Sequence, residues 1–184
     1  MIRLLLITLM FSFSFLSVSL ISQELPFSDI SKVEKDYTAG NVAARMVEGL
    51  GFRYYWATEG LSSDDLKYKP SESGRSSAET IKHIYDLSLF MTKFLKLTPE
   101  TTESTNLEEL RSASLFNFKA ASLLLKSMNS SDFQNYKMGD ITSWHLINGP
   151  IADALWHTGQ VVMLRRASGN PLPTGVNVLM GTQN

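Results

Sequence analysis

The stretch from Asn148 to Pro173 constrains the fold most, because it has the pattern of one long helix with clear ends. Pro150 suits the first turn of a helix, where its missing N–H removes no hydrogen bond, and Gly169 is a typical C-terminal stop. Apolar side chains fall on nearly every side between these ends: Ile151, Ala154, Leu155, Trp156, Val161, Val162, Met163 and Leu164. Such a helix is typical of a buried central element.

Three polar residues interrupt this apolar helix. Asp153 and His157 are four residues apart and therefore share one face, which Gln160 continues. An acid, an imidazole and an amide in line on a buried helix require polar partners.

Three further segments show helical spacing of apolar residues: Gly40–Gly60, Ser76–Leu97 and Asn106–Met128. Ser76 and Glu79 match a capping box, and Asn106 is a suitable N-cap. Four helical patterns without convincing strand pairs predict an all-α protein, a four-helix bundle. The segment between Asn129 and Asn148 is long enough to be a lid over a site.

The N-terminal segment from Met1 to about Ser22 reads as a separate unit. Arg3 precedes an uncharged apolar run, and small residues follow before Gln23, which is the pattern of a secretory signal peptide. The alternative is an uncleaved membrane anchor. We therefore expect an exported or membrane-anchored protein with four parts: a leader (1–22), a lead-in (23–40), a helical bundle (41–173) and a tail (174–184).

Composition excludes several classes of function. With 17 basic and 18 acidic residues the net charge is −1, so we expect no nucleic-acid partner. The chain has no cysteine, which excludes disulfides, thiolate metal sites and a cysteine nucleophile. No glycine-rich phosphate-binding loop occurs either.

The histidines suggest a metal centre. His83 lies on an apolar stripe of the second helix, so it should point inward and could meet Asp153 and His157. Two imidazoles and a carboxylate suit one divalent ion (zinc, nickel, iron(II) or manganese) and leave positions open for water. Gln160 could hydrogen-bond to the metal-bound water or to a ligand imidazole and so orient it. Tyr54 and Trp56 could line the pocket.

Simpler readings exist for the same residues. An inward histidine is often a hydrogen-bonded core residue, and Asp153 could be stabilised by the dipole of its helix N-terminus. His145 is by default a surface residue.

Two stretches carry a resemblance to a known family. The run from Asp153 to Gln160, DALWHTGQ, resembles the fourth-helix motif H-x-x-x-H-x-G-Q of the DinB-like (DinB/YfiT-like) superfamily, and the run from Gly74 to His83 is similar to the approach to its first histidine. The connection from Leu61 to Pro70 is also similar to that of the family, so the resemblance covers roughly Asn41 to Pro173.

The resemblance implies a four-helix bundle with a divalent metal held by three histidines, often in a dimer. Characterised members include thiol-dependent transferases and isomerases, and some hydrolases. His83 and His157 match two ligands, and Asp153 stands where the family commonly has the third histidine.

We therefore expect a divalent-metal-binding protein, a metal-dependent hydrolase or group transferase that acts on a small molecule. The alternative is a non-catalytic exported bundle that binds a ligand or holds the three residues as a buried polar network.

Overall fold

The computed structural model describes residues 24–184, so the predicted signal peptide lies outside the described residues. The described chain is mostly helical, which confirms the all-α class. None of its helices is both long enough and apolar enough to cross a bilayer.

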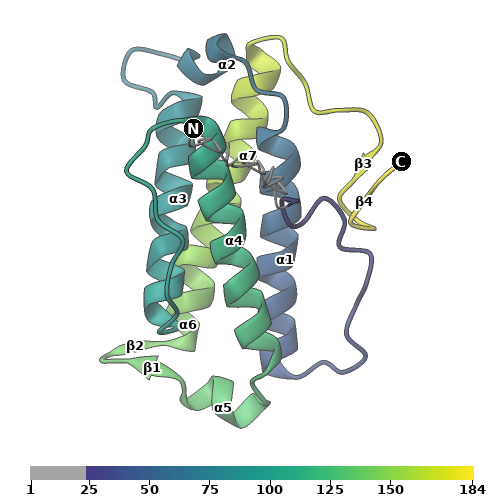
Figure 1. Ribbon diagram of the computed structural model, residues 1–184, viewed down its shortest axis with the longest axis vertical. Helices are drawn as coiled ribbons and strands as arrows, with labels where there is room; N and C mark the ends of the chain where they lie inside the picture. The colour runs from purple at the N-terminus through teal and green to yellow at the C-terminus, as the bar shows by residue number, and fades with distance from the viewer. Residues whose placement is uncertain (1–23) are drawn as a thin grey trace, which may run out of the picture.

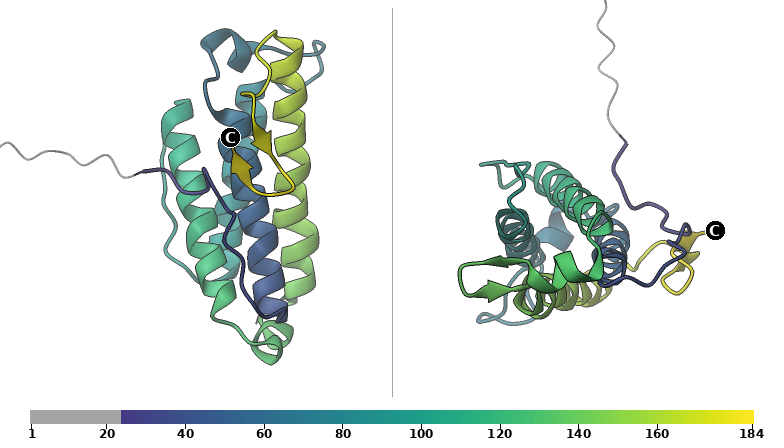
Figure 2. Two further views of the ribbon diagram at one scale, coloured as in Figure 1. Left: turned by 90° about the vertical axis from the view of Figure 1, so that its right-hand side faces the viewer. Right: turned by 90° about the horizontal axis from the view of Figure 1, so that it is seen from below.

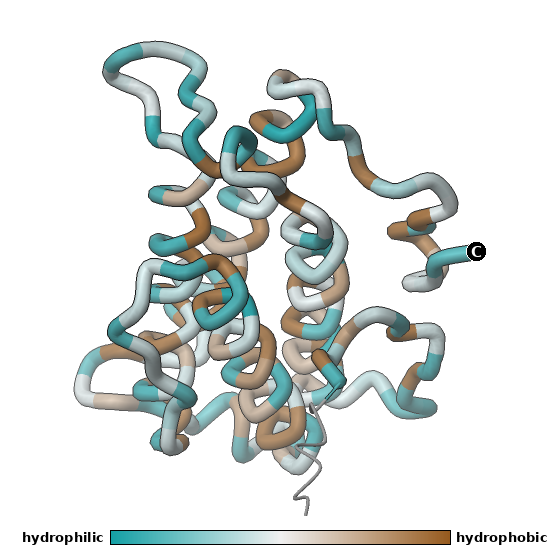
Figure 3. The backbone as a smooth tube through the Cα atoms, turned by 45° about the horizontal axis from the view of Figure 1, so that its top comes forward, coloured by the Kyte–Doolittle hydropathy of each residue, from teal (hydrophilic) through white to brown (hydrophobic). Residues whose placement is uncertain are grey.

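Four long helices pack side by side: α1 (Ala39–Thr58), α3 (Ser77–Phe94), α4 (Leu107–Lys126) and α7 (Ala152–Ala167). Both α1 and α3 contact α4 on one side and α7 on the other (Figure 1). Hydrophobic and hydrophilic residues alternate along these helices, as expected of amphipathic helices around one core (Figure 3). That core is filled from all four helices, with Leu50 and Tyr54 of α1, Ile84 of α3, Phe118 of α4 and Val161 of α7 among its buried residues.

Two predicted helix starts are confirmed. The hydroxyl of Ser76 accepts from the N–H of Glu79 (3.1 Å), and the Glu79 carboxylate accepts from the N–H of Ser76 (2.7 Å). The side chain of Asn106 accepts from the N–H of Glu108 and begins α4. These local hydrogen bonds satisfy N–H groups that have no partner within the helix.

The predicted start of the fourth helix is wrong. The chain is already helical in α6 (Ser143–Leu146) and continues through the π-helical turn η1 (Ile147–Ile151) directly into α7. Pro150 therefore lies inside a helical stretch and not at its start. The proline lacks an N–H and its ring crowds the preceding turn, and the wider π turn, in which the N–H of Ala152 reaches the carbonyl of Ile147, accommodates it.

The prediction that this helix is buried on all sides is also wrong. Trp156 is 74 % exposed and Met163 is 63 % exposed, and Leu155 is partly exposed as well. The buried face of α7 consists of smaller or polar residues for much of its length, such as Ala154 and Thr158. Although α7 has apolar residues on nearly every side, some of its large apolar side chains are therefore exposed to solvent.

The connections hold short elements. They are α2 (Ser63–Lys67), α5 (Ser130–Asn135), the hairpin β1 (Lys137–Met138) with β2 (Ile141–Thr142), and the hairpin β3 (Val176–Asn177) with β4 (Thr182–Gln183). The segment after α4 is thus folded at the lower end in Figure 1, and none of its residues lines the pocket beside His83 and His157, so the predicted lid is wrong. The C-terminal hairpin lies beside the N-terminal segment on one side of the helices, where the N–H of Ile30 donates to Gly181 (2.8 Å) (Figure 2).

Arg165 joins the end of α7 to the end of α1. Its guanidinium is buried and donates to the backbone oxygens of Trp56, Ala57 and Glu59, at 3.0, 3.0 and 3.1 Å. Its Nε also donates to the backbone oxygen of Asn170 (2.7 Å). The cation thereby satisfies carbonyls at a helix C-terminus, where a positive charge is favourable.

Asp65 of α2 completes this junction. Its carboxylate accepts from the N–H of Ser62 (2.8 Å), the amide of Asn170 (2.7 Å) and the hydroxyl of Ser168. Burial alone would raise the pKa of Asp65, but these hydrogen bonds to the charged form hold the pKa well below its ordinary value.

We expect Asp65→Asn to lower the free energy of unfolding by about 2 kcal/mol at pH 7, because an amide cannot accept all of these hydrogen bonds. Since the folded-state pKa lies below the unfolded value of about 3.9, the carboxylate stabilises the fold above that pH and loses its effect as the pH falls below it. Urea unfolding from pH 7 to pH 2 should show the two proteins converging below about pH 4. The exposed neighbour Asp64→Asn is the control, and equal stabilities at pH 7 would contradict the account.

Candidate metal centre

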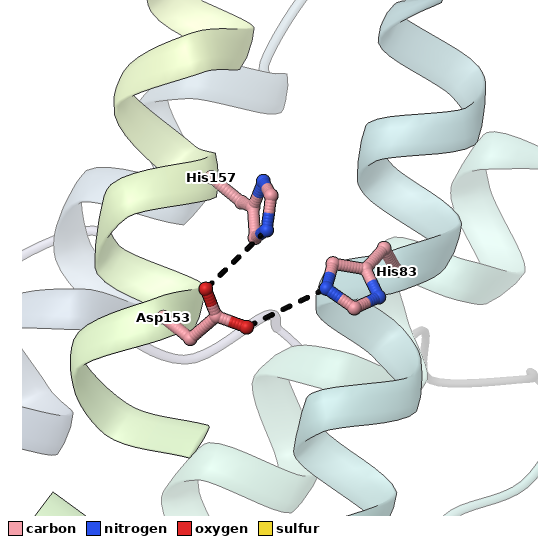
Figure 4. A group of neighbouring side chains, drawn as sticks. All are labelled: His83, Asp153 and His157. Carbon is pink, nitrogen blue, oxygen red and sulfur yellow. Dashed lines mark ion pairs between the residues drawn. The ribbon is translucent and has the colours of Figure 1, made fainter. Parts of the chain in front are cut away.

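Three predicted site residues meet in the groove between α3 and α7. His83 projects from α3, and Asp153 and His157 project from α7, so that the carboxylate faces both imidazoles (Figure 4). One possible ligand atom from each residue lies within 4.8 Å of the other two. The prediction that these three side chains converge is confirmed.

The distances within the group fit a shared cation better than hydrogen bonds. His83 Nε2 lies 3.5 Å from one carboxylate oxygen of Asp153, and His157 Nε2 lies 3.4 Å from the other. An N–H···O hydrogen bond is usually 2.7–3.2 Å long. Ligand atoms bound at about 2.1 Å to one tetrahedral ion lie about 3.4 Å apart, which is close to these separations, and each nitrogen is nearest a different oxygen of Asp153. The residues present therefore fit a divalent ion.

The helix dipole does not account for Asp153. Because α6, η1 and α7 follow one another without a break, the backbone ahead of Asp153 is already helical, and the N–H of Ala152 is paired with the carbonyl of Ile147. The positive end of a helix dipole lies at unpaired N–H groups, and there are none at this position. The carboxylate of Asp153 thus faces the two imidazoles and is not stabilised by a helix N-terminus.

Gln160 fixes the orientation of His157. The Gln160 side-chain oxygen lies 2.7 Å from His157 Nδ1. An amide oxygen can only accept, so in this contact Nδ1 is the donor, and Nε2, which faces Asp153, is the nitrogen left to bind a metal. This is the arrangement in which an imidazole is ready to bind a metal, and it matches the orienting role predicted for Gln160.

The site is open to solvent. The side chains of His83, Asp153 and His157 are 32 %, 43 % and 14 % exposed. The two histidines line a pocket of about 720 Å³ together with Pro70, Arg75, Thr80, Trp156, Gly159, Gln160, Met163 and Leu164. Small molecules therefore have access to the imidazoles, and the description of a buried polar network does not fit these exposures.

The two aromatic residues predicted to line the pocket lie elsewhere. Tyr54 is fully buried in the core, edge-on to Phe118 at 6.0 Å between ring centroids, and this burial raises the pKa of its phenol. Trp56 donates its indole N–H to the backbone oxygen of Ser28 (3.1 Å). Both predictions are corrected: the aromatic wall of the pocket is Trp156, which the sequence had indicated as a core residue.

His145 is exposed, as expected. Its Nδ1 accepts from the N–H of Thr142 (3.0 Å) and serves the start of α6. Arg75 was not predicted as a pocket residue, because a loop residue before a helix carries no periodic pattern that would place it beside His83.

Compared with models of known protein families, with curated proteins and with solved structures, the chain matches none of them. The function is therefore argued from the site alone.

We expect Gln160→Leu to weaken zinc or nickel binding about tenfold, because the leucine leaves His157 free to rotate and to change tautomer. Gln160→Glu retains an acceptor at the same distance and should bind the metal at least as well as the wild type. Competition with a chromophoric chelator measures both affinities, and thermal melting of the metal-free proteins checks that the fold is intact. Equal affinity of the leucine variant and the wild type would contradict the role of Gln160.

Proposed function

We propose that the protein is an exported, divalent-metal-binding four-helix bundle of the DinB-like type, which acts on a small molecule by metal-assisted hydrolysis or group transfer. His83, Asp153 and His157 would hold one ion of zinc, nickel, iron(II) or manganese. The ligand set contains two neutral imidazoles and one carboxylate, which all four ions accept.

The observation that carries the proposal is the spacing of the three side chains. Separations of 3.4 and 3.5 Å between the imidazole nitrogens and the two carboxylate oxygens are too long for good hydrogen bonds, and one ligand atom from each of the three residues lies within 4.8 Å of the other two, as a shared ion requires. Without a metal, an imidazole–carboxylate pair of this length on a partly exposed surface contributes little to the stability of the fold. A purely structural network of these three residues would therefore be weak.

The open pocket favours chemistry over a purely structural ion. Structural metal sites are closed by four protein ligands, whereas three ligands leave room for water or substrate. A divalent ion held there would act as a Lewis acid and lower the pKa of a bound water. Gln160 would orient the imidazole of His157 through Nδ1, and the apolar side chains of Trp156 and Met163 line the pocket beside the ion. A homodimer, which the family resemblance implies, stays a prediction.

We expect the protein expressed without residues 1–22, and purified without a metal-binding tag, to contain about one equivalent of a divalent transition metal. Asp153→Ala and His157→Ala should each lose most of it, because a cluster of two ligands binds far more weakly than one of three. Inductively coupled plasma mass spectrometry measures the content. His145→Ala is the matched control, because His145 is exposed and belongs neither to the cluster nor to the lining of the pocket beside it, and it should retain the metal.

Chelation gives a second readout that needs no substrate. Since a metal that binds only the folded state stabilises it, EDTA should lower the melting temperature of the wild type and leave Asp153→Ala unchanged. Metal-free wild type that cannot be reloaded, with the same melting temperature in EDTA, would contradict the proposal and favour the polar network.

A further inference from the structure

The pocket beside the histidines contains features that metal binding alone does not require. Its lining combines a metal-binding corner, an exposed aromatic and thioether wall and one cationic side chain. We infer that the substrate is an amphipathic organic anion: a metal-binding group at one end, a flat apolar body and a carboxylate-like group that reaches Arg75. This inference rests on the proposed function.

The wall is formed by Trp156 and Met163 of α7. The two residues are seven positions apart, which is about two helical turns, so they lie on the same face of α7. Both side chains are largely exposed. Exposed large apolar side chains that gather at one place are typical of a binding site. A flat apolar body could cover the indole and the thioether, which have no other cover among the described residues.

Arg75 supplies the charge. The other pocket-lining residues contribute no permanent charge, so Arg75 sets the sign of the pocket beyond the cluster. Within residues 24–184, Arg45 and Arg111 form ion pairs, and Arg53 and Arg165 donate to backbone carbonyls, but no such contact involves Arg75. Its guanidinium is therefore available to bind a carboxylate with two hydrogen bonds.

The acid at this end of α3 does not neutralise Arg75. Glu79 is paired with Lys69 at 3.3 Å and also accepts from the N–H of Ser76. With a divalent ion and one carboxylate, Asp153, the cluster would have a net charge of +1, and Arg75 adds a second positive charge. An anion is thus favoured over a neutral or cationic substrate.

The test uses three matched probes on the metal-loaded protein: benzhydroxamic acid, which chelates divalent ions, and its meta- and para-carboxylate derivatives. Isothermal titration calorimetry should show at least one carboxylate derivative binding roughly fivefold to tenfold more tightly than the parent, which is the effect of one partly exposed charge-assisted ion pair. Arg75→Gln should abolish this preference without changing the metal content.

Two control variants separate the parts of the inference. Arg166→Gln removes another exposed arginine, one that does not line the pocket, and should retain the preference. Trp156→Ala should weaken all probes about equally, whereas Trp144→Ala, which removes an exposed tryptophan outside this pocket, should leave them unchanged.

Equal affinity for the parent and both carboxylate derivatives, or a preference that survives Arg75→Gln, overturns the inference while the metal site stands. Wild type that takes up no metal and binds no hydroxamate overturns the proposed function and this inference together. Measuring the metal content before each titration distinguishes the two failures.

Discussion

The packing of α3 against α7 determines the site, because the two helices carry different members of one cluster. The two helices are in contact, and the residues next to the cluster in the sequence, Ile84 on α3 and Ala154 and Thr158 on α7, are buried. In this packing His83 and Asp153 are near neighbours and yet slightly too far apart for a good hydrogen bond. A cation between His83 and Asp153 would link α3 to α7. Metal binding should therefore raise the free energy of unfolding, and loosening the contact between these helices should weaken metal binding.

Both ends of α7 are fixed by features that serve this geometry. At its N-terminal end the π turn η1 leads the chain past Pro150 without ending the helix, and one extra residue in a turn rotates everything that follows by about 100°. At its C-terminal end Arg165 is held by carbonyls of α1 and by Asn170. The orientation in which Asp153 and His157 face α3 thus depends on contacts at both ends of the helix.

Sequence reasoning identified the cluster because its signals are local. Asp153 and His157 share a face at a spacing of four, Gln160 is one turn further on, and His83 lies on the stripe of a helix with a clear capping box. Which helices face each other, and at what distance, depends on packing, and no residue spacing reveals it.

The errors arose where long-range contacts override a local pattern. The amphipathic phenol of Tyr54 favours a place at the pocket, but its ring is buried in the core. The apolar pattern predicts Trp156 in the core, but its side chain is exposed and lines the pocket beside the histidines. Pro150 is a good first residue of a helix, and only the structure shows that a wider turn places it in the interior. Arg165 finds its partners more than 100 residues away along the chain.

The central claim is that two imidazoles and one carboxylate hold a single divalent ion. X-ray absorption spectroscopy of the metal-loaded protein tests it most directly, because imidazole rings give an outer-shell scattering pattern that carboxylates and water lack. The account predicts two imidazoles in the wild type, with oxygen in the other positions, and three imidazoles in Asp153→His, since position 153 faces the same ion. An absence of imidazole scattering in the wild type, or the same number of imidazoles in both proteins, would contradict it.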